Sequence, residues 1–292
     1  MLVPVKHNRD MNKLSQAKKT QVVSALLEGC SIRSTVRMTG VAKGTITRLV
    51  ADLGLACGRY QDRVLRNLRC ERIQVDEIWA YCYAKQKNVT LEMATERICG
   101  DTWTWVAIDA DTKLVPCWLV GKRDAGCAAE FIQDLASRLA NRIQLTSDGH
   151  RVYLNAVIDA FANEIDYAQL IKVYGQDRAG EARYSPAQFI ATERIRVIGG
   201  PDPRYISTSY VERQNLTMRM NMRRFTRLTN GFSKKIENHM ASVALHYMHY
   251  NFGRIHQTLR VTPAMQAGIS SHIWSVGEIV ALMDTESARQ VA

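Results

Sequence analysis

The sequence predicts an α/β protein in which a small all-α helix-turn-helix domain precedes a larger mixed-sheet domain. Two patterns carry this prediction. Apolar side chains recur at helical spacing in residues 12–53, and strand-like segments are interspersed with helical ones from residue 73 onward. The composition agrees, because 46% hydrophobic and 23% charged residues in a chain of 292 are typical of a globular protein that can bury a core.

The charge of the chain narrows the choice of partners. The formal net charge is +11 and the pI is about 9.4, which favours an anionic partner, nucleic acid before a membrane surface. No segment approaches the roughly 20 apolar residues of a membrane-spanning helix, so no membrane partner is expected. The seven cysteines include no C-x-x-C pair. This argues against a zinc ribbon or a disulfide framework and predicts a reduced, cytoplasmic setting.

The first domain is predicted to contain three short helices within residues 12–53. Ser15 is the expected N-cap of the first helix, Gly29 its stop, and Gly40 the end of the second. The third helix carries apolar residues on one side and polar or basic ones on the other, as in a helix-turn-helix. The alternative to a DNA-binding helix-turn-helix is a three-helix bundle whose pattern reflects packing alone. The candidate DNA-binding residues on this helix are Lys43, Thr45, Thr47 and Arg48.

The second domain is predicted over residues 73–255, after a basic helix or linker at 54–72 and before a helical C-terminal segment at 256–292. Residues 175–208 show little periodicity and are expected to form a long surface excursion. Strands are expected at 73–83, 102–109, 113–121, 143–148 and 168–175, and helices at 125–142, 153–162, 207–229 and 235–252.

Three acidic residues occupy related positions in these elements. Asp76 lies within the apolar first strand, Asp148 ends the fourth strand, and Glu212 lies near the start of a helix. In a mixed sheet the first and fourth strands can be neighbours, and a helix against that edge could add the glutamate. Clustered carboxylates suit hard divalent cations, and two such ions are a known device for phosphodiester chemistry.

Each of the three acids also has a structural explanation. Asp76 could pair with an arginine, Asp148 could close a turn with Gly149, and Glu212 could stabilise its helix N-terminus. Two further acids are expected to lie outside the group. Glu77 should point to the opposite face of the strand from Asp76, and Asp109 should belong to a turn.

Four motifs resemble the DDE-type insertion-sequence transposases, specifically the insertion-sequence-one family. They are IQVDEIW at 73–79, LTSDGH at 145–150, STSYVERQNLTMRMNMRRFTRLTNGFSKK at 207–235 and HYNFGRIHQTLRVTPAM at 249–265. The block YVERQN is the most specific of them. The resemblance extends over nearly the whole chain from Met11 onward.

The resemblance implies a ribonuclease-H-like catalytic domain with two Mg²⁺ or Mn²⁺ ions, held by Asp76, Asp148 and Glu212. It implies nicking at transposon ends and attack of the freed 3′ hydroxyl on target DNA. The expected partner is double-stranded DNA, and the protein is expected to form a homo-oligomer on it in the bacterial cytoplasm. Arg219, seven residues after the glutamate, falls where the family has a basic residue thought to contact DNA.

The basic run after Glu212 is expected to hold DNA phosphates. Its arginines are predicted to lie on one helix: Arg219, Arg223, Arg224 and Arg227. The chain departs from many family members in lacking an N-terminal cysteine zinc ribbon, which leaves end recognition to the helix-turn-helix or to a partner. Two other functions remain open: a catalytically silent DNA-binding regulator, and a metal-dependent nuclease that does not join strands.

Overall fold

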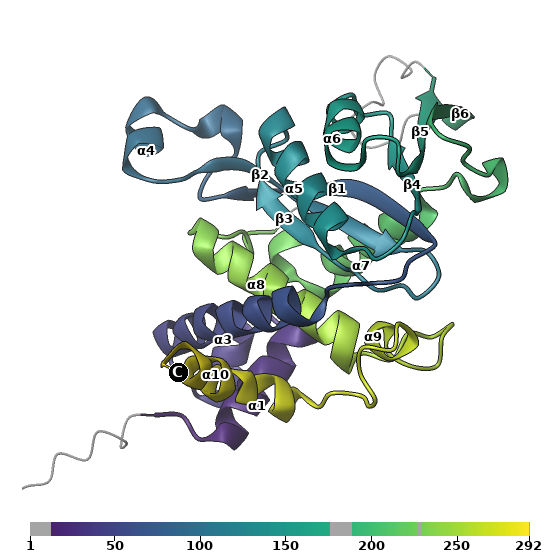
Figure 1. The fold of residues 1–292 in the computed structure, drawn as a ribbon. Helices are drawn as coiled ribbons and strands as arrows, with labels where there is room; N and C mark the ends of the chain where they lie inside the picture. Colours follow the sequence, from purple (N-terminus) through teal and green to yellow (C-terminus); the bar gives the residue numbers. More distant parts are fainter. Residues whose placement is uncertain (1–12, 176–188, 227–228, 292) are drawn as a thin grey trace, which may run out of the picture.

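A six-stranded mixed sheet forms the centre of the larger part of the molecule (Figure 1). The computed structural model describes residues 13–175, 189–226 and 229–291. The strand order is β3-β2-β1-β4-β5-β6. The strands are β1 (Arg72–Cys82), β2 (Gly100–Asp109), β3 (Trp118–Gly121), β4 (Gln144–Asp148), β5 (Asp166–Tyr174) and β6 (Phe189–Ile198). Strand β4 is parallel to its neighbours β1 and β5, and the other pairs are antiparallel.

The two faces of the sheet pack against different helices. Helices α5 (Ala125–Arg138) and α6 (Val152–Phe161) cover one face, where Phe131 and Tyr153 contact the ring of Trp105. Helices α7 (Ser209–Asn221) and α8 (Ile236–Met248) cover the other, where Trp118 packs against Tyr247. Strand β1 alternates between these faces, so that Val75 joins the first core and Ile78 the second.

The N-terminal helices pack closely against the C-terminal ones. They are α1 (Gln16–Leu27), α2 (Ile32–Thr39) and α3 (Lys43–Val64), and α10 (Val276–Val291) lies beside α1 and α3 (Figure 1). Helix α3 also packs along α8 so closely that a Cβ on Gly54 would lie 2.2 Å from the carbonyl oxygen of Ala241. Buried residues of α1 and α3 belong to the same apolar cluster as those of β1 and α5. The hydrophobic core is therefore continuous between the two predicted domains.

Several local predictions are confirmed. Ser15 caps α1 through its side chain, and Gly40 ends α2 in the left-handed conformation. Asp109 accepts hydrogen bonds from the backbone of Asp111 and from the hydroxyl of Thr112, as a turn residue does. The segments 102–109 and 113–121, separated by a turn at Asp111 and Thr112, are typical of a hairpin, and β2 and β3 do form an antiparallel pair.

Several predictions about element boundaries are wrong. The strand predicted at 113–121 is formed only by Trp118–Gly121. The region 175–208 contains β6, which pairs with β5 at the edge of the sheet. The helix predicted at 207–229 ends at Asn221, because Met222 is extended and the short 3₁₀ turn η3 (Arg223–Phe225) follows. Helix α3 does not end near residue 53 but continues to Val64, so the first part of the segment 54–72 is helical, one of the two predicted alternatives. The domain boundaries themselves stay predictions.

The remaining elements are short. They are η1 (Gln86–Asn88), α4 (Leu91–Glu96), η2 (Pro203–Tyr205), the π-helical turn η4 (His249–Gly253) and α9 (Pro263–Gln266). Within the described residues, no helix has the length and apolar character needed to cross a membrane.

Candidate active site

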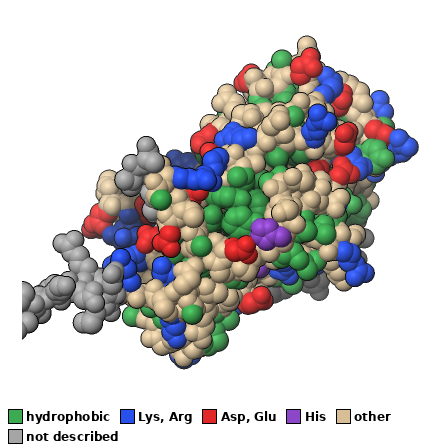
Figure 2. Space-filling model, turned by 60° about the horizontal axis from the view of Figure 1, so that its bottom comes forward, with side chains coloured by type: hydrophobic (Ala, Val, Ile, Leu, Met, Phe, Trp, Pro, Cys, Tyr) green, Lys and Arg blue, Asp and Glu red, His purple; other side chains and the backbone are tan. Residues whose placement is uncertain are grey.

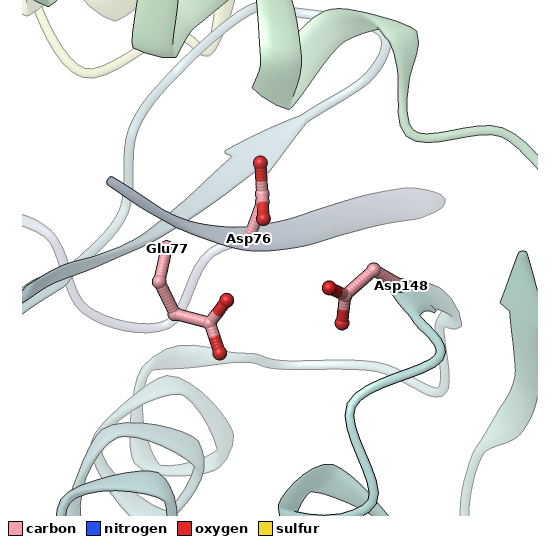
Figure 3. A group of neighbouring side chains, drawn as sticks. All are labelled: Asp76, Glu77 and Asp148. Atoms are coloured by element: carbon pink, nitrogen blue, oxygen red, sulfur yellow. The ribbon is translucent and has the colours of Figure 1, made fainter. Parts of the chain in front are cut away.

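The acidic residues meet where β1 and β4 part. The two strands pair through Ile73 with Leu145 and Gln74 with Thr146, after which the ladder stops. Both strands continue beyond this point, and extending the register by two residues brings Asp148 beside Asp76. This confirms that the first and fourth strands are neighbours, and it explains why two acids far apart in sequence lie close together (Figure 3).

Asp76 lies on the face of β1 that is covered by α7. Its Oδ2 accepts a hydrogen bond of 2.8 Å from the side-chain amide of Asn215. Burial raises the pKa of the Asp76 carboxyl to about 6, and the negative charges of Asp148 and Glu212 act in the same direction. Among the described ion pairs, none includes Asp76, so the alternative role as a partner of an arginine has no support.

Glu77 belongs to the same acidic group, contrary to the sequence prediction. Oxygen atoms of Asp76, Glu77 and Asp148 all lie within 4.8 Å of one another. The side chain of Glu77 does leave β1 on the opposite face, as strand alternation requires. Its carboxylate nevertheless points toward Asp148, at a level where β1 and β4 no longer pair (Figure 3).

The carboxylate of Glu77 is buried without adequate compensation. The side chain is 1% exposed, and neither oxygen has a hydrogen-bond partner of acceptable geometry among the described residues, although the buried Tyr153 hydroxyl interacts with the carboxyl group. Arg123 is the nearest cation, with its Nη2 3.6 Å from Glu77 Oε2 and 3.8 Å from Asp148 Oδ2. Burial, and after it the charge of Asp148, raises the pKa of Glu77 to about 8, although Arg123 acts against this rise.

The first turn of helix α7 is hydrogen-bonded to β1. The side-chain oxygen of Gln74 accepts hydrogen bonds from the backbone N–H groups of Tyr210 and Val211, at 2.8 and 3.2 Å. These contacts hold the helix that carries Glu212 against the edge where Asp76 lies. They satisfy two N–H groups that the start of a helix leaves without intrahelical partners.

Glu212 approaches the acidic group but is held by other residues. Its Oε1 accepts hydrogen bonds from the Lys172 ammonium and the Thr208 hydroxyl. It is therefore not one of the three residues whose oxygens lie within 4.8 Å of one another. The structure brings Asp76 and Asp148 together and places Glu212 near enough to affect the pKa of Asp76. Lys172, which the sequence analysis did not identify, is a charged residue in the apolar segment of β5.

The donor set suits divalent cations. All of the converging ligand atoms are carboxylate oxygens, the ligands that Mg²⁺, Mn²⁺ and Ca²⁺ prefer. Arg123 lies near the carboxylates of Glu77 and Asp148, and no described ion pair includes Asp76, which leaves an excess of negative charge in a partly buried place. Asp148 also accepts a hydrogen bond of 3.0 Å from the backbone N–H of His150, so its role in a turn coexists with its place in the acidic group.

A groove of about 820 Å³ separates the N-terminal helices from η3 and the start of α8. Its charged lining residues are all basic: Arg33, Lys43, Arg223, Arg224, Lys234 and Lys235. On the face drawn in Figure 2, Lys and Arg side chains lie among Asp and Glu around a hydrophobic centre. The groove lining therefore gathers cationic groups without an acidic counterpart, which suits a polyanion.

Four of the predicted DNA-binding residues line this groove, namely Lys43, Thr47, Arg223 and Arg224. Thr45 and Arg48 are exposed on the first turns of α3 but lie outside the lining. Arg224 donates to the Ser233 hydroxyl, and burial lowers its pKa to about 10. Arg219 is half-buried on α7, separated from the groove arginines by the end of that helix. Arg227 lies outside the described residues.

Comparisons with known proteins give no close relative. No family model matches the chain, and no curated protein sequence is similar to it. Among solved structures, a piggyBac transposase synaptic complex with hairpin DNA is 10% identical, with a TM-score of 0.41, over 94% of this chain and 72% of that one. The Mos1 strand transfer complex is 11% identical, with a TM-score of 0.24, over 84% and 78%. Likenesses this weak show neither a shared fold nor a shared function, so the residues of the chain itself must carry any functional conclusion.

Proposed function

We propose that the protein is a DDE-type DNA transposase that cuts the ends of an insertion sequence and joins them to target DNA. The observation that carries the proposal is the convergence of Asp76 and Asp148 where β1 and β4 part, with Glu212 held nearby by α7. The strand order β3-β2-β1-β4-β5 agrees with the ribonuclease-H-like architecture that the sequence motifs imply.

In this proposal Asp76, Asp148 and Glu212 hold two Mg²⁺ or Mn²⁺ ions. Bound there, the ions would activate the attacking oxygen and stabilise the departing 3′ oxygen. Asn215 orients the carboxylate of Asp76 through its hydrogen bond. Lys172 and Thr208 hold the carboxylate of Glu212 and keep its repulsion with Asp76 small until cations arrive.

The reaction needs no protein nucleophile. A water oxygen attacks a phosphorus at the transposon end, the bond from phosphorus to the 3′ oxygen breaks, and a free 3′ hydroxyl remains. That hydroxyl then attacks a phosphorus of the target strand, whose own 3′ oxygen leaves. The first step leaves a 5′ phosphate on the flanking strand, and the second forms a new phosphodiester. In both steps phosphorus gains one oxygen and loses a 3′ oxygen, so the same carboxylates serve both.

The basic groove is the proposed contact for the double-stranded DNA substrate. Lys43 and Thr47 reach it from the helix-turn-helix region, and Arg223 and Lys234 from the segment after α7. Cationic side chains of this kind bind phosphates without reading the base sequence. A homo-oligomer on DNA is part of the proposal, because two transposon ends must be held for joint insertion.

A strand-transfer assay tests the proposal. The purified protein is incubated with Mg²⁺, an acceptor plasmid and labelled DNA that carries the ends flanking its coding region. Labelled plasmid is the expected product. Cleaved ends without joined product would favour the nuclease, and binding without either product would favour the DNA-binding regulator.

A further inference from the structure

The buried carboxylate of Glu77 is the feature of the acidic group that the proposed chemistry leaves unexplained. Its side chain is 1% exposed and both oxygens lack a hydrogen-bond partner of acceptable geometry among the residues that the structure describes. A buried, unpaired carboxylate is strongly unfavourable, so the group must either take up a proton or bind a cation. Strand alternation alone would let Glu77 avoid Asp148, yet its oxygens point toward it (Figure 3).

Arg123 does not supply the missing compensation. Its closest contacts to Glu77 and Asp148 are 3.6 and 3.8 Å, which are too long for hydrogen bonds. Its side chain is 37% exposed and also lies over the ring of Trp103, with 4.8 Å between Cζ and the ring centroid. One guanidinium also cannot balance three carboxylates.

The spacing of the oxygens fits a single divalent cation. Opposite ligands of one ion are separated by about 4.2 Å for Mg²⁺ and 4.8 Å for Ca²⁺, twice the usual metal–oxygen distances. Oxygens of Asp76, Glu77 and Asp148 already lie within 4.8 Å of one another. They reach the gap from both faces of β1 and from the end of β4, so a cation there would be held from three sides.

We propose that Glu77 is itself a cation ligand, which completes with Asp76 and Asp148 a three-carboxylate site for a divalent cation. The inference rests on the proposed function, since it shares two of the acids assigned to phosphoryl transfer. The inference adds that this cation is bound by Asp76, Glu77 and Asp148 and not by Glu212. The carboxylate of Glu212 is instead bonded to Lys172 and Thr208. Arg123 then acts as the partial counter-ion of the metal-free state.

Titration of the full-length protein with Mn²⁺ tests this inference without DNA. Calorimetry and the electron paramagnetic resonance signal of free Mn²⁺ give the dissociation constant. Glu77→Gln, which is nearly isosteric, is expected to weaken binding at least tenfold, as is Asp148→Asn. Glu130→Gln, an exposed glutamate on α5, is the matched control and should bind as the wild type does.

A second variant separates a ligand from a mere partner of the arginine. If Glu77 is a ligand, Arg123→Gln should bind Mn²⁺ at least as tightly as the wild type, since a competing cation is gone. If Glu77→Gln binds Mn²⁺ within twofold of the wild type, or if Arg123→Gln loses Mn²⁺ as Glu77→Gln is expected to, the inference is wrong.

A measurement on the wild type guards against misfolding of the variants. In crystals soaked with Mn²⁺, the anomalous signal should lie within about 2.5 Å of a Glu77 oxygen. A peak that only Asp76, Asp148 and Glu212 coordinate would overturn the inference and leave the proposed transposase intact. If the wild-type protein binds Mn²⁺ through Glu77 but does not transfer strands, the proposed transposase is wrong and the inference about Glu77 stands.

Discussion

The side-chain amide of Asn215 on α7 donates a hydrogen bond of 2.8 Å to Oδ2 of Asp76 on β1. This contact ties the helix that carries Glu212 to the strand that carries the first acid. Because the orientation of a ligand carboxylate depends on such neighbours, we expect Asn215→Ala to lower the cleavage rate about 10- to 100-fold.

DNA affinity should stay unchanged in Asn215→Ala, since Asn215 is buried. The measurement is single-turnover cleavage of labelled end DNA beside a gel-shift titration. Thr217→Ala is the control, because Thr217 lies on the same helix and its hydroxyl donates to the backbone oxygen of Arg213. Equal cleavage rates in the two variants would show that Asn215 does not orient the carboxylate of Asp76.

The basic groove predicts a specific pattern of DNA binding. Replacing Lys43 and Lys234 together by alanine removes two cationic groups from the lining. If each contacts a phosphate, the slope of log K against log salt should fall by about two, with weaker binding to all sequences alike. Fluorescence anisotropy at several salt concentrations measures the slope. Lys87→Ala, an exposed lysine on η1 outside the groove, should leave it unchanged.

The close approach of α3 and α8 predicts a steric effect at one glycine. In Gly54→Ala the new methyl group would meet the backbone of Ala241 at 2.2 Å, so the helices must separate. We expect the free energy of unfolding to fall by about 1–3 kcal/mol. Gly44→Ala on the same helix has open space around it and should be neutral or slightly stabilising. Urea denaturation measures the free energy of unfolding of both variants. Similar curves for the two would contradict the close packing of α3 against α8.

Buried histidines on α8 predict sensitivity to acid. Burial lowers the pKa values of His239 and His246 to about 3, whereas the unfolded chain titrates near 6.5. Well above pH 6.5, both histidines are neutral in the folded and in the unfolded state. As pH falls from 6.5 toward 3, only the unfolded state takes up these protons, so stability is lost across that window. At pH 5 the loss is about 2 kcal/mol for each histidine.

His246→Leu should recover about half of that loss between pH 7 and pH 5. Denaturant unfolding at the two pH values measures it. His272, which is exposed and paired with Glu278, provides the control variant His272→Gln. If His246→Leu keeps the full pH dependence of the wild type, His246 is not neutral and buried in the folded protein.

The sequence alone predicts those strands and helices whose buried side chains form a recognisable apolar pattern. The strand of Asp76 and the strand that ends at Asp148 are apolar segments bounded by turns, and their adjacency follows from the mixed-sheet order. Strand β6 has almost no buried side chains. It forms by pairing with β5 rather than by facing a core, so hydrophobic periodicity could not predict it.

The active-site predictions failed where long-range geometry decides. The alternation of side chains along a strand correctly predicts that Glu77 leaves β1 on the opposite face from Asp76. Whether Glu77 reaches the acidic group depends on where β4 stops pairing with β1, which the sequence does not show. The contact between Lys172 and Glu212 joins elements 40 residues apart, and no local pattern indicates it. A second acid beside Asp76 in an apolar strand was the one available signal, since two buried carboxylates require compensation.

The most direct test of the account compares the wild type with Asp148→Asn in cleavage and joining of end-containing DNA with Mg²⁺. The exchange removes one charge and keeps the shape of the side chain, so DNA affinity should stay within about twofold while both products fall at least about a hundredfold. Asp101→Asn, an exposed residue at the far end of β2, should keep full activity. An Asp148→Asn protein that cuts and joins DNA as the wild type does would contradict the central claim.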